Sequence, residues 1–250
     1  MHAPKVTFLI IGAQKAGTTA LEHCLRQHPE VGMADVKEVH YFDDDGRFAA
    51  EPGDHGAYEA QFPGERVAHG EATPIYLYWE PCCARIQRYN PAMRIVAVLR
   101  DPVRRAYSQW NMEFNRGDEL CDVEAAFAAE VAFHQQHPGA QHRVLSYLDR
   151  GFYSTQVQRY QRHFDAEQLL WLRYDDLLND PQGTLERVHR HIGVDPGQGA
   201  VGLPTLNRGA YAAPLDPVLE GRLRRMFAGD IRRTAQLTGL DLQAWLGSAG

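Results

Sequence analysis

Short unbroken apolar runs mark the buried strands that the sequence predicts. The clearest is residues 6–11, a continuous run of β-branched and aromatic side chains, and residues 94–99 form a second strong run. Weaker candidates are residues 66–69 and residues 169–172, the latter closed by Tyr174-Asp175-Asp176. A strand buried on both faces has this continuous pattern, which is typical of a parallel sheet covered by helices.

Between these runs the apolar residues recur every three or four positions, which predicts helices. The predicted helices cover residues 20–28, 103–116, 123–134, 141–149, 155–164, 181–191 and 216–238. Asp101 can cap the second of these, because Pro102 follows it as a first helical residue. Strands that alternate with helices predict an α/β fold, in which helices flank a central, mostly parallel sheet in three layers. We expect one domain over residues 1–250.

Composition and charge exclude several classes of protein. Hydrophobic residues make up 44% and charged residues 23%, which argues against disorder and against a coiled coil. The net charge of −6 disfavours a nucleic acid as partner. No segment approaches the roughly 18 apolar residues of a membrane span, and residues 6–11 are too short for the core of a signal peptide. We therefore expect a cytoplasmic protein that contacts neither nucleic acid nor membrane.

The residues after the first strand have the composition of a phosphate-binding loop. Gly12 and Gly17 permit a tight turn, and successive amides can point at an anion beside the positive end of the next helix. Lys15 adds a charge, and Thr18 and Thr19 add hydroxyl donors. The spacing imitates the nucleotide-triphosphate loop G-x4-G-K-[ST], but Thr18 stands where that motif has lysine. A glycine turn with a solvated lysine is the alternative without a ligand.

A family resemblance begins at this displaced lysine. The segment Gln14-Lys15-Ala16-Gly17-Thr18-Thr19 resembles the 5′-phosphosulfate loop of sulfotransferases that use 3′-phosphoadenosine 5′-phosphosulfate (PAPS), above all in the heparan sulfate and bacterial branch. The segment R-D-P-V-R-R-A-Y-S at residues 100–108 resembles the family's 3′-phosphate motif, which implies that Arg100 and Ser108 hold the 3′-phosphate. On chemical grounds alone, a guanidinium and a hydroxyl can grip a phosphate together.

Other residues of this second motif have different expected roles. Arg104 lies one helical turn before Ser108 and can assist it or extend into solvent, whereas Arg105 is expected to be solvated. The aromatic residues that follow are spaced as the buried face of a helix, so we expect core packing rather than a platform for a base; they are Tyr107, Trp110 and Phe114.

A carboxylate and an imidazole stand close together in the segment V-K-E-V-H-Y-F at residues 36–42. In an extended backbone alternate side chains share a face, so Glu38, His40 and Phe42 are expected on one side. The segment resembles the family's K-E-x-H-[FY]-F pattern, which implies that Glu38 is the catalytic base and that His40 orients it or binds substrate. A surface Glu–His pair without a catalytic role is the alternative.

Three further segments extend the resemblance over residues 8–245. Residues 70–76 resemble the family's G-E-K-[ST]-P-x-Y segment, but Ala72 stands where many glycan-modifying relatives carry a lysine. Asn207-Arg208-Gly209 resembles the late element that closes over the 3′-phosphate, which implies donor contacts from Arg208 and Gly209; an ordinary exposed loop arginine is the alternative. Residues 237–245 resemble the family's usual carboxyl-terminal segment.

No metal ligands are predicted. Asp43-Asp44-Asp45 is interpreted as a solvated turn that ends at Gly46 rather than as a cation site. His189 and His191 stand two apart on a predicted helix, and this spacing does not place them on one face for a metal.

The resemblance implies a P-loop-like sulfotransferase fold and a sulfotransferase activity. Such an enzyme moves a sulfuryl group from PAPS to a hydroxyl or amine of an acceptor and releases 3′-phosphoadenosine 5′-phosphate (PAP), and we expect no metal. The expected acceptor is a small metabolite, a natural product or a saccharide, and no oligomeric state follows from the sequence. Two alternatives stay open, an ATP-dependent P-loop kinase and a catalytically inactive nucleotide-binding module.

Overall fold

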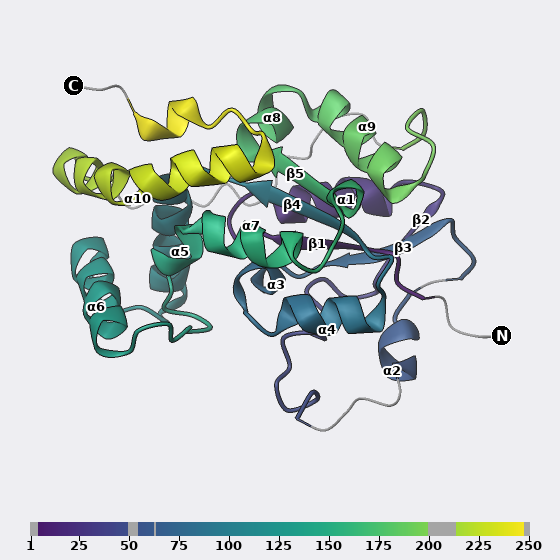
Figure 1. Cartoon of the computed structure of the whole chain (residues 1–250), viewed down its shortest axis with the longest axis horizontal. Coiled ribbons are helices and arrows are strands. Elements are labelled where there is room, and N and C mark those ends of the chain that lie inside the picture. Colours follow the sequence, from purple (N-terminus) through teal and green to yellow (C-terminus); the bar gives the residue numbers. More distant parts are fainter. Residues whose placement is uncertain (1–4, 50–54, 63, 200–213, 248–250) are drawn as a thin grey trace. The chain divides into compact units, whose positions relative to one another are not determined.

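Five parallel strands form the central sheet of this protein (Figure 1). The computed structural model describes residues 5–49, 55–62, 64–199 and 214–247. The strands are β1 (Phe8–Gly12), β2 (Val31–Met33), β3 (Ala68–Ala72), β4 (Arg94–Leu99) and β5 (Leu169–Arg173), in the order β2-β3-β1-β4-β5. Every neighbouring pair is parallel, which confirms the predicted sheet.

The central position of β1 follows from its sequence, because all five of its residues are buried and a parallel sheet covers both faces of such a strand. Neighbouring backbones can approach closely where glycine omits a side chain. A Cβ on Gly70 of β3 would lie 2.5 Å from the ring of Phe8, so this ring packs where any other residue would collide with it. The register between β1 and β4 shifts between Ile10 and Gly12, at the end from which the predicted loop leaves.

The chain divides into two units, each described separately here. Residues 1–99 with 159–206 form the first unit, which contains the sheet, and residues 100–158 with 207–250 form the second. The single domain expected over residues 1–250 stays a prediction.

Helices cover both faces of the sheet in the first unit. Its helices are α1 (Thr18–Arg26), α2 (Gly56–Glu59), α3 (Ile75–Tyr78), α4 (Cys82–Tyr89), α8 (Tyr174–Asn179) and α9 (Pro181–Ile192), with a 3₁₀ turn η2 (Ala166–Gln168). Figure 1 shows α9 on one side of the sheet and α4 on the other. The predicted α/β architecture with flanking helices is therefore confirmed. Residues 174–176, expected as the turn that closes a strand, begin α8 instead.

The second unit is helical. It contains α5 (Pro102–Arg116), α6 (Val123–Gln136), α10 (Pro217–Thr238), η1 (Asp149–Gly151) and η3 (Gln243–Leu246), and α7 (Tyr153–Gln161) crosses the boundary between the units. The predicted start of α5 is confirmed, because the Asp101 carboxylate accepts hydrogen bonds from the amides of Val103 and Arg104 ahead of Pro102. Among the described residues, no helix has both the length and the apolar character needed to cross a membrane.

The helix predicted over residues 141–149 is wrong. Side chains occupy the backbone groups that a helix would use: the Gln109 amide donates to the Val144 carbonyl, and Arg105 donates to the Tyr147 carbonyl. His142 Nδ1 accepts from the Val144 amide as well. Because side-chain partners satisfy these groups, the apolar spacing alone does not produce a helix here.

Candidate active site

The loop between β1 and α1 presents a row of backbone amides. Ala13 N still donates to the Val98 carbonyl of β4 at 2.7 Å, and the Gly17 carbonyl accepts from the amides of Ala20 and Leu21 at the start of α1. Over the ranges that the structure describes, no hydrogen bond uses the amides of the three residues that open the helix, Gly17, Thr18 and Thr19. These amides can therefore bind an anion at the positive end of the helix.

Gly17 is required by the geometry of this loop. Its φ of +84° lies in the left-handed region, which other residues adopt only with strain. A Cβ there would lie 2.9 Å from the ring of Tyr174 in α8. Lys15, two residues earlier, also has a positive φ, of 68°. The backbone thus winds tightly between β1 and α1, as the glycine spacing predicted.

The predicted phosphosulfate-loop residues follow one another along this turn. Gln14 and Lys15 are partly exposed, whereas Ala16 is fully buried and fixes the loop to the core. Thr18 is buried and Thr19 is partly exposed at the first turn of α1. The chemistry of this set, one cation with backbone and hydroxyl donors, fits the phosphosulfate end of PAPS.

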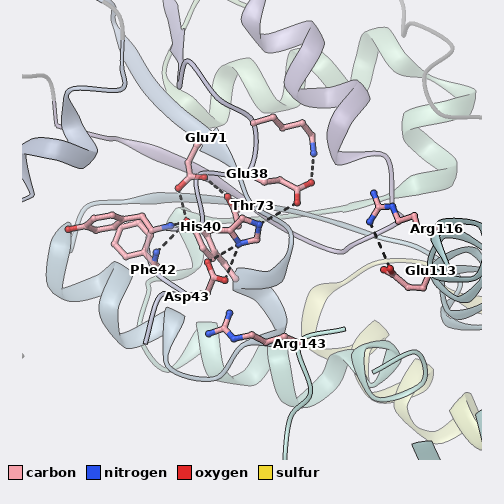
Figure 2. A network of polar contacts seen from close by, with 12 residues as sticks. Glu38, His40, Phe42, Asp43, Glu71, Thr73, Glu113, Arg116 and Arg143 are labelled. Atoms are coloured by element: carbon pink, nitrogen blue, oxygen red, sulfur yellow. Dashed lines mark hydrogen bonds and ion pairs between the residues drawn. The ribbon is translucent and has the colours of Figure 1, made fainter. Parts of the chain in front are cut away.

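A second cluster of charges lies in residues 37–43 and is drawn in Figure 2. The Lys37 ammonium donates to Glu38 Oε1, and Glu38 Oε2 lies 3.7 Å from Nε2 of His40. The other ring nitrogen, Nδ1, lies 3.0 Å from Oδ2 of Asp43. Figure 2 shows the His40 ring between the Glu38 and Asp43 carboxylates. The sequence therefore correctly predicted that Glu38 and His40 lie together.

These contacts shift the titration of both groups. Asp43 and then Glu38 raise the pKa of His40 from 6.5 to about 10, because both carboxylates favour the imidazolium. His40 and then Lys37 lower the pKa of Glu38 from 4.5 to about 2, against the opposing effect of burial. At neutral pH the cluster thus holds an ionised Glu38 beside a protonated His40.

The extended backbone expected for this segment is wrong. Glu38 has a φ of 58° and His40 a φ of 55°, so both residues lie in the left-handed region. A non-glycine residue held there costs roughly 1–3 kcal/mol and persists only where the surroundings fix it. The two side chains meet because of this tight winding rather than through strand alternation.

Asp43 is a member of this charge cluster that sequence reasoning missed. The interpretation of Asp43-Asp44-Asp45 as a solvated turn is wrong for its first member, whose side chain is 4% exposed against His40. The next two residues are exposed, as expected, and Asp45 pairs with Arg85 at 2.8 Å. A signal was present in the spacing, because Asp43 stands three residues after His40, within reach of the imidazole.

The predicted 3′-phosphate residues lie in the second unit. Arg100 precedes the cap of α5, and its carbonyl accepts a 2.9 Å hydrogen bond from the Tyr153 hydroxyl. Ser108 lies within α5 and is 8% exposed. In the described part of the chain its hydroxyl has no hydrogen-bond partner, so it can bind a phosphate oxygen. This orphaned hydroxyl fits the predicted role.

Arg104 and Arg105, in the segment 100–108, differ in their exposure to solvent. Arg104 is half exposed and pairs with Glu220 at 3.1 Å, so it forms an ion pair in solvent. Arg105, expected to be solvated, is fully buried, which corrects that expectation. Its guanidinium donates to Gln109 at 2.8 Å and to the Tyr147 carbonyl, so burial is offset by hydrogen bonds.

The aromatic residues of α5 stack in a row. The rings of Tyr107 and Trp110 lie 5.6 Å apart and those of Trp110 and Phe114 lie 5.1 Å apart. Tyr107 and Trp110 are buried, as expected, whereas Phe114 is 39% exposed and only partly covered by its neighbour.

The sequence also singled out Ala72, Arg208, Gly209, His189 and His191. Ala72 is buried as the last residue of β3. Arg208 and Gly209 lie outside the described residues, so their donor contacts stay predictions. His189 is buried against His28, and His191 Nε2 lies 3.1 Å from the Ile95 carbonyl. Within the described ranges, no group of three or more histidine, cysteine, aspartate or glutamate side chains is arranged to hold a metal ion.

Comparison with known proteins agrees with this arrangement. The family model for the sulfotransferase domain matches residues 82–202. Human heparan sulfate glucosamine 3-O-sulfotransferase 3B1 is 30% identical over 192 residues, which cover 74% of this chain and 45% of that protein. The bovine bifunctional heparan sulfate N-deacetylase/N-sulfotransferase 2 is 27% identical over 201 residues, or 76% of this chain and 22% of that protein. The chain thus spans less than half the length of these curated relatives.

Solved structures extend the likeness to nearly the whole chain. A sulfotransferase from Alicyclobacillus acidocaldarius has a TM-score of 0.81 and 28% identity, and the match covers 97% of this chain and 99% of that one. The sulfotransferase domain of the Synechococcus PCC 7002 olefin synthase, at 17% identity and a TM-score of 0.51, shares the fold, with 96% and 95% of the two chains covered. The predicted sulfotransferase fold is confirmed. The fold and these relatives together show that the chain is similar to sulfotransferases over nearly its whole length, as its motifs predicted.

Proposed function

We propose that this protein transfers a sulfuryl group from PAPS to a hydroxyl or amine of an acceptor and releases PAP. The loop after β1 carries this proposal. In it, Lys15 precedes three amides at the start of α1 that donate to no acceptor in the described part of the chain. A sulfuryl transfer develops charge on the oxygens of donor and acceptor, so positioning and fixed donors supply most of the catalysis.

Each end of the donor has its own set of residues in this proposal. The loop from Gln14 to Thr19 binds the 5′-phosphosulfate, and Arg100 with Ser108 binds the 3′-phosphate. Support comes from the sheet, because β1 and β4 are adjacent and parallel and the two motifs follow their carboxyl ends. Arg208 and Gly209 are proposed to close over the 3′-phosphate.

Glu38 is the proposed base. It is ionised at neutral pH, because its pKa is lowered to about 2, and it needs no prior loss of a proton. A carboxylate of such low basicity accepts a proton readily once the acceptor oxygen is acidified by bonding to sulfur, which places the proton transfer late in the reaction. His40 holds the Glu38 carboxylate and is itself held by Asp43.

Lys15 is proposed to stabilise the bridging oxygen that leaves with PAP. The sulfuryl group carries one ionisable oxygen, so its transfer needs less cationic charge than that of a triphosphate group, and we propose that no metal ion takes part. A kinase is not favoured, because Thr18 stands where a nucleoside triphosphate loop has lysine and the relatives are sulfotransferases. A catalytically inactive module is tested by the experiment below.

The acceptor is proposed to be a small metabolite, a natural product or a saccharide, and the protein is proposed to act in the cytoplasm. The two relatives described above are named for heparan sulfate, a polyanionic saccharide. The net charge of −6 favours a less anionic acceptor than that polymer.

The direct test is an acceptor screen with ³⁵S-labelled PAPS in the presence of EDTA, with the products identified by mass. We expect transfer by the wild type and at least a hundredfold loss in Lys15→Ala, the loss typical of removing one preorganised oxyanion donor. Lys5→Ala, at a cation outside the loop, is the matched control and should retain wild-type turnover. Transfer by Lys15→Ala at the wild-type rate would contradict the proposed role of the loop.

A further inference from the structure

Glu71 is a buried carboxylate that the proposed chemistry does not use. It stands in β3 with 1% of its surface exposed. Its Oε1 accepts from the hydroxyls of Tyr58 at 3.0 Å and Tyr76 at 2.9 Å, and its Oε2 accepts from the Thr73 hydroxyl at 2.5 Å. Burial raises the pKa of this carboxyl, and its hydrogen bonds to Thr73, Tyr76 and Tyr58, with the backbone amide of Val39, act in the opposite direction. A buried acidic group with this many donors is a fixed acceptor rather than a solvated charge.

Two of these contacts lead to the segment that carries the proposed base. Val39 is the residue between Glu38 and His40, and its backbone amide interacts with the Glu71 carboxylate. The Tyr76 hydroxyl donates to Glu71, and it accepts a 2.8 Å hydrogen bond from the Tyr41 amide. The Phe42 amide lies 3.3 Å from the same hydroxyl. The Glu71 carboxylate is therefore linked through the Tyr76 hydroxyl to the backbone that follows His40, and it also interacts with the Val39 amide that precedes His40.

The segment needs such an anchor because of its backbone conformation. Glu38 and His40 both have a positive φ, and neither is a glycine. Such a winding persists only where surrounding groups determine it. The side chains of Glu38 and His40 are 39% and 51% exposed, so their own packing supplies little of that restraint. Figure 2 shows Glu71 and Thr73 beside the segment that carries Glu38 and His40.

We propose that Glu71 is a positioning residue, whose carboxylate holds residues 38–42 in the strained winding that brings Glu38 against His40. This inference rests on the proposed function for its effect on sulfuryl transfer. The coupling of Glu71 to the Glu38–His40 contact can be tested without any sulfuryl transfer.

Two variants separate positioning from simple core packing. Glu71→Gln keeps the size of the side chain, but it replaces one acceptor oxygen by an amide donor that faces hydroxyl donors. Tyr76→Phe keeps the ring, but it removes the hydroxyl that links Glu71 to the amides of Tyr41 and Phe42. Tyr58→Phe is the matched control, because its hydroxyl donates to the same Oε1 and makes no hydrogen bond to residues 37–42.

The first readout separates turnover from donor binding. We expect Glu71→Gln to lower kcat by roughly tenfold to a hundredfold, since small displacements of a reacting group cost this much, and to leave PAP affinity within about threefold. Tyr76→Phe should also lower kcat without weakening PAP binding, but its loss of kcat should be smaller. Tyr58→Phe should keep at least about half of kcat. Equal losses of kcat and of PAP affinity in Glu71→Gln would overturn the proposal, as would wild-type kcat. If Glu71→Gln does not fold, Tyr76→Phe decides, and behaviour identical to that of Tyr58→Phe overturns it.

The second readout does not depend on any reaction. The titration of His40, followed by NMR of its ring, reports the contacts with Glu38 and Asp43 that face it. We expect the pKa of His40 to fall in Glu71→Gln and to stay at its wild-type value in Tyr58→Phe. An unchanged His40 titration in Glu71→Gln overturns the positioning role. Absence of sulfuryl transfer by the wild type would instead contradict the proposed function and leave this comparison intact.

Discussion

Glu38, His40 and Asp43 illustrate how a few charged side chains fix one another's protonation. The imidazole lies between two carboxylates, and Lys37 donates to the outer one. Each favourable contact stabilises the charged form of both partners, so the pKa of the base falls while that of the acid rises. The result is a carboxylate that stays ionised at neutral pH and a cation that holds it in place.

The first prediction concerns the base. Glu38→Gln keeps the shape of the side chain but removes its capacity to accept a proton, so kcat should fall roughly a hundredfold or more, as is usual for loss of a general base. PAP affinity should stay within about twofold. Calorimetric PAP titration and initial rates measure the two effects. Glu186→Gln, in an exposed ion pair on α9, is the control. A Glu38→Gln enzyme that keeps full turnover would remove Glu38 from the mechanism.

The second prediction concerns pH. The pKa of His40 is raised from 6.5 to about 10, so its pairing stabilises the fold fully below pH 6.5 and is lost as the pH rises through about 10. The pKa of Glu38 is lowered from 4.5 to about 2, so its pairing is present above pH 4.5 and is lost as the pH falls toward 2.

Urea denaturation of the wild type and of His40→Asn checks this dependence. The wild type should be more stable by less than about 1 kcal/mol at pH 6, since both side chains are partly exposed and screened by water. The difference should vanish near pH 10.5. A difference that grows with pH would show that His40 is neutral in the folded protein.

Sequence reasoning found the residues whose neighbours along the chain reveal them. Glu38 and His40 lie two apart, and the loop glycines stand at a spacing that few other structures need. Burial of Asp43 and Arg105 follows instead from partners that the local pattern does not indicate, such as the Tyr147 carbonyl 42 residues from Arg105. A run of three aspartates and an arginine pair suggest solvent exposure unless the tertiary contacts are known.

The loop after β1 and helix α1 together form the anion-binding unit that we propose. β1 ends in a register shift, Ala13 stays bonded to β4, and the chain then turns through Lys15 and Gly17 into the helix. Tyr174 of α8 packs over Gly17 and closes the turn. Any side chain at position 17 must therefore move either this ring or the loop.

The third prediction concerns a side chain added at Gly17. Gly17→Ala should destabilise the fold by about 1–3 kcal/mol and weaken PAP binding at least tenfold, because the left-handed φ and the Tyr174 ring both oppose a Cβ. Gly193→Ala is the matched control, with a φ of +82° and no atom within 4 Å of the added Cβ. Gly193→Ala should lower the melting temperature and leave PAP affinity unchanged. Equal PAP affinities in the two variants would contradict the proposed role of the loop.

The fourth prediction concerns α5 and the segment that it anchors. Arg105→Leu leaves the Tyr147 carbonyl and the Gln109 side chain without their donor, and should destabilise the protein by about 2–4 kcal/mol. Arg104→Leu removes a half-exposed ion pair and should cost less than about 1 kcal/mol. Chemical denaturation compares the two. Similar stabilities would show that burial of Arg105 contributes nothing to the fold.

Helices with long periodic patterns, such as α5, α9 and α10, were predicted well, and so was β4 from its unbroken apolar run. The three-residue strand β2 was missed because Val31–Met33 is too short to form a run. Helix α3 was missed because its four residues, all buried, are too few to show a helical period. Helix α4 was missed although its buried residues follow helical spacing, since its eight residues span only about two turns. The helix predicted over residues 141–149 fails because Gln109 and Arg105, distant in sequence, bind its backbone.

We propose that the whole chain binds one donor nucleotide through two anion-binding motifs. These motifs follow β1 and β4, which are neighbours in the sheet, and they carry complementary parts: a row of amides with Lys15, and the Arg100 guanidinium with the Ser108 hydroxyl. A nucleotide with a phosphate at each end is the ligand class that needs both.

The affinity of the wild type for PAP relative to AMP, measured calorimetrically in EDTA, tests this claim most directly, because the two nucleotides differ only in the 3′-phosphate. We predict a preference for PAP of about a hundredfold or more, from charge-assisted contacts of about 1.5–3 kcal/mol each, and its reduction at least tenfold in Arg100→Ala. Equal affinities for PAP and AMP, or tighter binding of ATP with magnesium than of PAP, would contradict the account.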